Sequence, residues 1–273
     1  MPIFQIFRLL FQTLRLAFNN KEDLAHLKSF VTGSKSVPSF DDAYQRGDYV
    51  KAFELAEDYK SHGKKTAHFC YYRGSTAFQL GRFEESEQYL REALEFEQDP
   101  QLKALVHEQL GLTLHAQGRF EEAIAANEAA IALWPERGCG HRGIAAAMLC
   151  SGTNPGVALT RAKQAVEVDR STEQLSQEAY KTNISESLAI LAWAVGSTDG
   201  SEWDIDKITA ESLGLWGKNT TPALAQIHCH VAQGYMAVGK ELKAMQHFEQ
   251  AATLDPNGYY GRLAKANEPH IEQ

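Results

Sequence analysis

The sequence is poor in the residues that mark several common protein classes. It holds only four cysteines, eight prolines and twenty glycines among its 273 residues. The cysteines are scattered along the chain and cannot form a disulfide framework, which favours a reducing, cytoplasmic compartment. So little proline and glycine excludes a collagen-like or linker-rich protein.

Positive charge and long apolar runs are also scarce. The formal net charge is −8 and the pI is about 5.7, so we expect no binding to nucleic acid, which needs a basic surface. Apolar residues make up 44% of the chain and charged residues 23%, as in ordinary globular proteins. This composition excludes a mostly disordered chain and a protein that crosses a membrane several times.

The N-terminal segment differs from the rest because it has no acidic residue before Glu22. Within residues 3–18, the few polar side chains recur every three or four positions, which predicts an amphipathic helix with a wide apolar face. The residues that we expect to make its contacts with a membrane or with another copy are Phe4, Phe7, Arg8, Leu10, Phe11, Leu14, Arg15 and Phe18.

Three roles are open for this N-terminal helix. At about 1.5 Å per residue it reaches roughly 24 Å, too short to span a membrane, and its arginines make spanning costly. It can lie flat in a membrane interface, which would make the protein peripheral. It can instead pack against this chain or a second copy, or it can act as a targeting sequence.

Glycines recur along the rest of the chain at nearly constant intervals. Successive glycines at helix ends are separated by 34, 37 and 34 residues, a period that is typical of solenoid proteins. Similar segments surround each one, with a helical pattern before the glycine and another after it. These glycines are Gly47, Gly81, Gly118 and Gly152, and a fifth, Gly239, lies in a matching segment near the C-terminus.

With these residues the chain resembles the tetratricopeptide repeat family, whose unit is two antiparallel helices with small residues at their crossing. The unit with the clearest match carries Leu110, Gly111, Leu114, Gly118, Phe120, Ala123, Ala130 and Pro135 at the family's recurring positions. The resemblance implies an all-α, right-handed α-solenoid of about six antiparallel helix pairs, preceded by the amphipathic N-terminal helix.

The repeat pattern also divides the chain. We expect the N-terminal segment over 1–34 and four repeats over 35–168. A degenerate helix pair with a longer turn follows over 169–221. The last repeat and a C-terminal capping helix then occupy 222–273.

The family resemblance implies a concave groove lined by the first helix of each pair, and this groove is the expected binding site for a protein partner. The side chains on the helix face next to the packing positions are mostly aromatic, amide or imidazole groups. They are His68, Tyr71, Tyr72, Ser75, Gln79, Leu105, Glu108, Gln109, Leu112, His115, Arg142, Gln226, His230 and Gln233.

Some family members use this groove to hold the carboxylate end of a chaperone with a Lys/Asn/Arg clamp. The matching places here offer no such chemistry, so we do not expect a chaperone-tail adaptor. They hold Val37, Asp41, Tyr72, Leu105 and Gln109.

The sequence shows no catalytic constellation. The glycines of residues 138–143 have the spacing of a dinucleotide fingerprint but follow a helix rather than a strand. His228 and His230 flank Cys229, yet neighbours two positions apart on a helix diverge by about 200° and cannot share one metal ion. We therefore expect no enzyme activity, no cofactor and no metal.

The sequence thus predicts a non-enzymatic scaffold or adaptor that binds a peptide or a helix of a partner protein in the groove. In this reading the N-terminal helix tethers the protein to a membrane surface. The alternative is a self-assembling structural protein, in which the N-terminal helix of one copy occupies the groove of the next.

Overall fold

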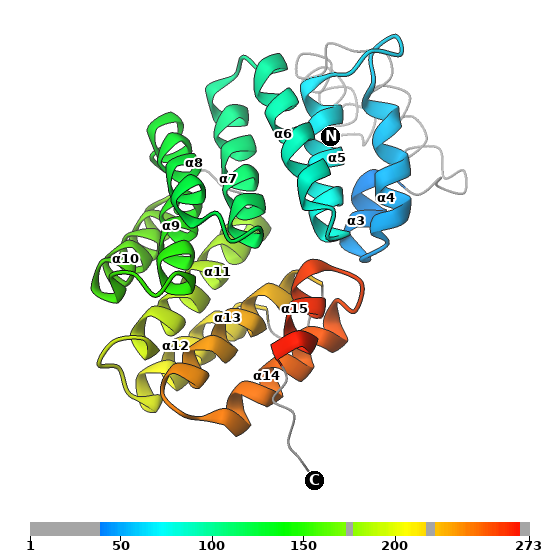
Figure 1. The fold of residues 1–273 in the computed structure, drawn as a ribbon. Helices are drawn as coiled ribbons and strands as arrows, with labels where there is room; N and C mark the ends of the chain where they lie inside the picture. The colour runs from blue at the N-terminus through cyan, green and yellow to red at the C-terminus, as the bar shows by residue number, and fades with distance from the viewer. Residues whose placement is uncertain (1–38, 173–176, 217–221, 268–273) are drawn as a thin grey trace, which may run out of the picture. The chain divides into compact units, whose positions relative to one another are not determined.

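The computed structural model describes residues 39–172, 177–216 and 222–267 (Figure 1). The chain divides into two compact units, Met1–Ser39 and Phe40–Gln273. The predicted N-terminal helix, with its expected contact residues from Phe4 to Phe18, lies outside the described residues. The fold described below is that of the second unit.

The described residues form thirteen α-helices and one short 3-10 helix, with no β-strand among them. None of the helices in this part of the chain is long and apolar enough to cross a membrane. The helices are α3 (Phe40–Gln45), α4 (Tyr49–Leu55), α5 (Ala67–Gln79), α6 (Phe83–Phe96), α7 (Pro100–Ala116), α8 (Phe120–Leu133), α9 (Cys139–Cys150), α10 (Pro155–Ser171), α11 (Gln177–Gly196), α12 (Glu202–Gly214), α13 (Ala223–Ala237), α14 (Glu241–Leu254) and α15 (Tyr259–Asn267), with the 3-10 helix Ala56–Tyr59 after α4.

Consecutive helices pack as six antiparallel pairs, from α3 and α4 to α13 and α14, and α15 follows the last pair (Figure 1). Each pair also packs on the next one, as in a solenoid. The predicted all-α right-handed solenoid of about six helix pairs is confirmed.

The repeated glycines end the first helix of five pairs with the same backbone turn. All five have a positive φ, between 67° and 76°, which a side chain would strain. The residue after each glycine donates its N–H to the carbonyl five positions back, at 2.8–3.0 Å, which closes the helix end. The glycines are Gly47, Gly81, Gly118, Gly152 and Gly239.

Small residues let the paired helices approach closely. A Cβ atom added to Gly74 would lie 2.7 Å from Leu90, and one added to Gly111 would lie 2.3 Å from the amide nitrogen of Asn127. Both glycines lie on the first helix of a pair, and both contacts are with the second helix. The sequence predicted small residues at these crossings.

The part of the chain without a clear repeat also folds as a helix pair, α11 and α12. Helix α12 begins with a capping box, in which the Ser201 hydroxyl accepts from the Asp204 N–H and the Asp204 carboxylate accepts from the Ser201 N–H. Each bond satisfies a donor that the first helical turn leaves free. The segment therefore continues the solenoid.

Helix α15 does more than cover the last pair, because it returns to the first pairs of the array (Figure 1). The Tyr49 hydroxyl donates to the Asp255 carboxylate at 3.0 Å, and the Arg262 guanidinium donates to the Gln79 carbonyl at 2.7 Å. The Gln79 side-chain oxygen accepts from the Tyr259 N–H at 3.1 Å. We call these five residues the end-to-end contact.

Candidate functional site: a cavity inside the solenoid

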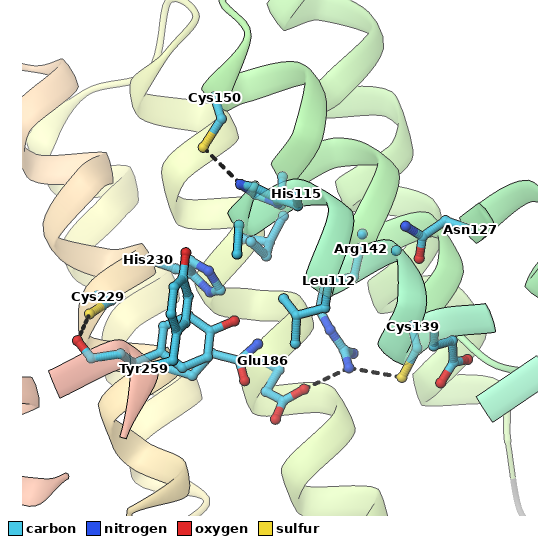
Figure 2. Close-up of a pocket in the computed structure, with 18 of the residues that line it drawn as sticks. Leu112, His115, Asn127, Cys139, Arg142, Cys150, Glu186, Cys229, His230 and Tyr259 are labelled. Atoms are coloured by element: carbon cyan, nitrogen blue, oxygen red, sulfur yellow. Dashed lines mark hydrogen bonds and ion pairs between the residues drawn. The ribbon is translucent and has the colours of Figure 1, made fainter. Parts of the chain in front are cut away.

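The first helices of five successive pairs and α15 surround a cavity of about 620 Å³ (Figure 2). Helices α5, α7, α9, α11 and α13 each contribute side chains to it, and Tyr259 and Tyr260 reach it from α15. This volume lies within the range of ordinary ligand pockets.

Each lining helix presents one face to the cavity because its lining residues are spaced by three or four. On α7 these residues include Leu105, Glu108 and Leu112, and on α13 they include Gln226 and His230. This spacing keeps side chains on one side of a helix, while the other side packs within the pair. The inward faces of the repeat helices therefore form a large part of the cavity wall.

Most of the residues predicted for the groove line this cavity. Ten of the fourteen do so: Tyr71, Leu105, Glu108, Gln109, Leu112, His115, Arg142, Gln226, His230 and Gln233. Their contact with a partner stays a prediction.

The other four predicted residues lie outside the cavity. His68 is exposed, and Ser75 is buried. Tyr72 packs among aromatic rings of the first pair, with its centroid 4.3 Å from that of Phe40. Gln79 takes part in the end-to-end contact. The structure therefore does not bring these four to the place where the ten others meet.

The sequence analysis missed the contribution of α11. Asn183, Glu186, Ile190 and Trp193 line the cavity from this helix. They lie in the degenerate segment, where no repeat pattern indicated which face of the helix points toward the cavity. Their spacing of three, four and three residues was a signal that could have identified them.

One side of the cavity carries paired charges. The Arg142 guanidinium donates to Glu186 at 2.6 Å (Figure 2). It also lies 3.4 Å from the Asp169 carboxylate. Arg137 holds Glu108 through two bonds of 3.1 and 3.0 Å. Burial raises the pKa of Glu186, and the neighbouring Arg142 opposes this shift. Each charged side chain of the lining thus already has an opposite charge from the same chain.

The facing side is aromatic and uncharged. The His230 ring stacks on Trp193 with centroids 5.9 Å apart and meets the edge of Tyr260 at 5.6 Å. Burial lowers the pKa of His230 to about 3, so the ring is neutral at pH 7. This wall suits an apolar or aromatic group better than a charge.

A histidine and a cysteine meet at one end of the cavity. The His115 ring nitrogen Nε2 lies 3.1 Å from the Cys150 sulfur (Figure 2). Burial lowers the pKa of His115 to about 4, so at pH 7 the ring carries no charge that would stabilise a thiolate. Within the described residues, no group of three or more His, Cys, Asp or Glu side chains could hold a metal ion.

Three buried polar nitrogens of the lining have no hydrogen-bond partner among the described residues. They are Gln109 Nε2, Asn183 Nδ2 and His230 Nδ1. Asn183 and His230 are only 7% and 8% exposed. These nitrogens have almost no accessible surface, so they lie behind the cavity wall, and each costs the fold about 1–3 kcal/mol.

Comparison with known proteins agrees with this architecture. Residues 67–136, which run from α5 to the end of α8, match the sequence profile of the tetratricopeptide repeat family. Residues 67–136 therefore carry tetratricopeptide repeats. No curated protein matches the sequence.

Two solved structures give partial matches to this chain. The chain is 15% identical to yeast Tom70, with a TM-score of 0.45, and the match covers 94% of this chain and 57% of that one. It is 16% identical to a tetratricopeptide repeat protein from Parabacteroides merdae ATCC 43184, with a TM-score of 0.42, and that match covers 83% of this chain and 93% of the other. The chain thus spans little more than half of the Tom70 chain.

Proposed function

We propose that this protein is a non-enzymatic scaffold that binds a peptide or a helix of a partner protein in the cavity. Proteins with tetratricopeptide repeats are typically protein-interaction scaffolds without catalytic activity. The position of the cavity, on the inner helices of five pairs, supports a binding role for this one.

The observation that carries the proposal is that the first helices of five successive pairs and α15 present side chains to one cavity of about 620 Å³. In its lining Glu108 and Glu186 are paired with Arg137 and Arg142, while Trp193, His230 and Tyr260 form an uncharged aromatic wall. The concave surface of a repeat protein is its usual binding surface.

A variant that fills the cavity tests the proposal. Leu112 lines the cavity and is partly buried, so Leu112→Trp adds a bulky ring inside it. Leu242 is 71% exposed and lies outside the lining, so Leu242→Trp adds the same ring to the surface as a matched control.

The measurement is quantitative affinity purification from the native host, with cross-links mapped by mass spectrometry. We expect a partner that cross-links to cavity helices, is retained by Leu242→Trp and is lost at least about tenfold with Leu112→Trp, as expected when about 1.4 kcal/mol of binding is removed. Equal retention by both variants, at unchanged melting temperature, would show that the cavity is not the binding site.

A further inference from the structure

Helix α15 packs on the last helix pair and also forms part of the cavity wall. Tyr260 and Ala264 are buried in the apolar cluster of α13 and α14. Tyr259, Leu263 and Asn267 of the same helix line the cavity. A ligand that fills the cavity therefore contacts α15.

The contact between α15 and the first pairs is narrow (Figure 1). The Tyr259 ring centroid lies 4.6 Å from that of Phe78 and 5.8 Å from that of Phe83. The Tyr259 N–H donates to the Gln79 side-chain oxygen at 3.1 Å, and the Arg262 guanidinium donates to the Gln79 carbonyl at 2.7 Å. We call these five residues the α15 seam.

The seam is the weaker of the two attachments of α15. Release of α15 from the last pair would expose Tyr260 and Ala264 together with the apolar cluster that they cover. At the seam, Tyr259 and Arg262 are only partly buried, so water can replace the hydrogen bonds that opening breaks. Phe78 is fully buried, which favours the closed form at rest.

Opening of the seam separates the two ends of the array. Because α15 stays on the last pair, the first pairs must move away from it, and the bond between Tyr49 and Asp255 also breaks. The curvature of a solenoid comes from small rotations between neighbouring units, so small changes at each pair can produce this movement.

A closed ring restricts what can enter it. The first helices of five pairs and α15 surround the cavity. An internal segment of a partner protein continues into chain at both of its ends and cannot thread into a ring. Such a segment enters only through a gap, and the α15 seam is the weakest place for one.

We propose that α15 is a strap that closes the cavity in the resting protein, and that the α15 seam opens to admit the partner. The proposal rests on the proposed function for what enters, and it adds how access to that site is regulated. Binding then competes with the seam, so a change that weakens the seam tightens apparent binding by the factor by which it raises the open fraction.

Thiol labelling of the full-length chain tests the strap without a partner. Cys139 lines the cavity from α9 and is partly buried. Two reagents of the same chemistry are compared, N-methylmaleimide and a maleimide attached to the central side chain of a ten-residue Gly/Ser peptide. The second cannot thread into a ring because chain extends on both sides of its reactive group. Mass spectrometry of digests gives the labelling rate of each cysteine.

Two double variants are compared with the wild type. Tyr259→Ala, Arg262→Ala weakens the seam and keeps the backbone bond to Gln79. Trp203→Ala, Arg170→Ala removes the same kinds of side chain from exposed positions outside the cavity and is the matched control.

We expect the peptide-borne maleimide to label Cys139 about 5- to 150-fold faster in the seam variant than in the wild type, as expected when a ring pair and a hydrogen bond are lost. The rate with N-methylmaleimide should change less, and the control variant should behave as the wild type.

Two other cysteines identify the movement. The Cys229 thiol donates to the Tyr260 carbonyl at 3.2 Å, so its labelling reports release of α15 from the last pair. Cys70 is buried outside the cavity, so its labelling reports unfolding. Both should stay protected in the seam variant. If Cys70 is labelled there, Arg262→Ala alone keeps the ring contacts and replaces the double variant in the same comparison.

Equal rates of Cys139 labelling by the peptide-borne maleimide in the seam variant and the wild type would overturn the strap. Labelling of Cys229 together with Cys139 would also overturn it, because α15 would then leave the last pair instead of opening at the seam. Neither result bears on the proposed function, which the Leu112→Trp comparison tests separately. Partner retention by Leu112→Trp would refute that function and leave the opening of the seam standing.

Discussion

Among single residues, Asn127 on α8 shows how tightly the repeats fit together. Its amide donates to the Ala123 carbonyl at 2.8 Å, and the side chain fills the space left by glycines on two other helices. A Cβ atom would lie 2.3 Å from Asn127 at Gly111 and 2.2 Å from it at Gly143. Neither glycine has a positive φ, so close packing is what requires them here.

Gly111→Ala is expected to destabilise the protein by about 1–3 kcal/mol, because the new methyl group overpacks the contact with Asn127. The free energy of unfolding in urea measures the effect. Gly156→Ala is the control, since nothing lies within 4 Å of its added Cβ in α10. That change should be neutral or stabilise the helix by up to about 1 kcal/mol. Equal effects at both sites would argue against a packing constraint at Gly111.

Among the helices, α15 is held on two sides. Tyr260 and Ala264 are buried with residues of α13 and α14. On the other side, the Tyr259 ring packs 4.6 Å from that of Phe78 in α5, and Arg262 bonds to the Gln79 carbonyl. Tyr259 also packs against the α13 and α14 cluster, so it contacts both sides, whereas the Arg262 bond to Gln79 belongs to the α5 side.

The double variant Tyr259→Ala, Arg262→Ala should loosen α15 from α5. It removes the ring contact and the Arg262 bond and keeps the backbone bond from the residue-259 N–H to Gln79, while Tyr260 and Ala264 still pack on α13 and α14. A ring pair and a hydrogen bond together contribute about 1–3 kcal/mol, so we expect amide exchange in α15 to speed up about 5- to 150-fold. Hydrogen exchange followed by mass spectrometry measures this rate. Unchanged exchange in α9 and α10 serves as the internal reference. Protection in α15 equal to that of the wild type would mean that the contacts with α5 add nothing.

The sequence predicted the helices and their pairing well, and it predicted contacts between helices far apart in the chain poorly. Glycine spacing and small residues predicted the pairs and their turns because these depend on contacts between neighbours in the chain. The inward face of α11 was missed because its segment lacks the repeat register. The return of α15 to α5 was missed because it depends on the accumulated geometry of all the pairs between them, which no local pattern encodes.

For the second unit as a whole, the end-to-end contact couples the first and last helix pairs. An open array has only neighbour contacts and can unfold piece by piece. Here Tyr49 and Asp255 are both buried, and their hydrogen bond joins residues 206 positions apart. Unfolding of either end must therefore break contacts at the other.

Tyr49→Phe removes this bond and leaves the Asp255 carboxylate buried. The carboxylate then still accepts from the Gly258 N–H but no longer from the Tyr49 hydroxyl. We expect the free energy of unfolding to fall by about 1–3 kcal/mol. The denaturation midpoints from tryptophan fluorescence and from circular dichroism should also move apart, because the ends are less coupled. Tyr89→Phe, at a partly exposed site in α6, should change the free energy by less than about 0.5 kcal/mol. Coincident midpoints in Tyr49→Phe would show that this bond does not set the cooperativity.

The same bond has a consequence for how the chain is made. Closing a loop of 206 residues instead of one repeat of about 34 costs about 1.6 kcal/mol more in chain entropy. At about 5–20 residues per second, a ribosome needs roughly 10–40 s to travel from Tyr49 to Asp255. During that interval the early helices have been made, but α15 does not yet cover Phe78 and the inner wall. The nascent chain can then bind chaperones or associate prematurely with other chains.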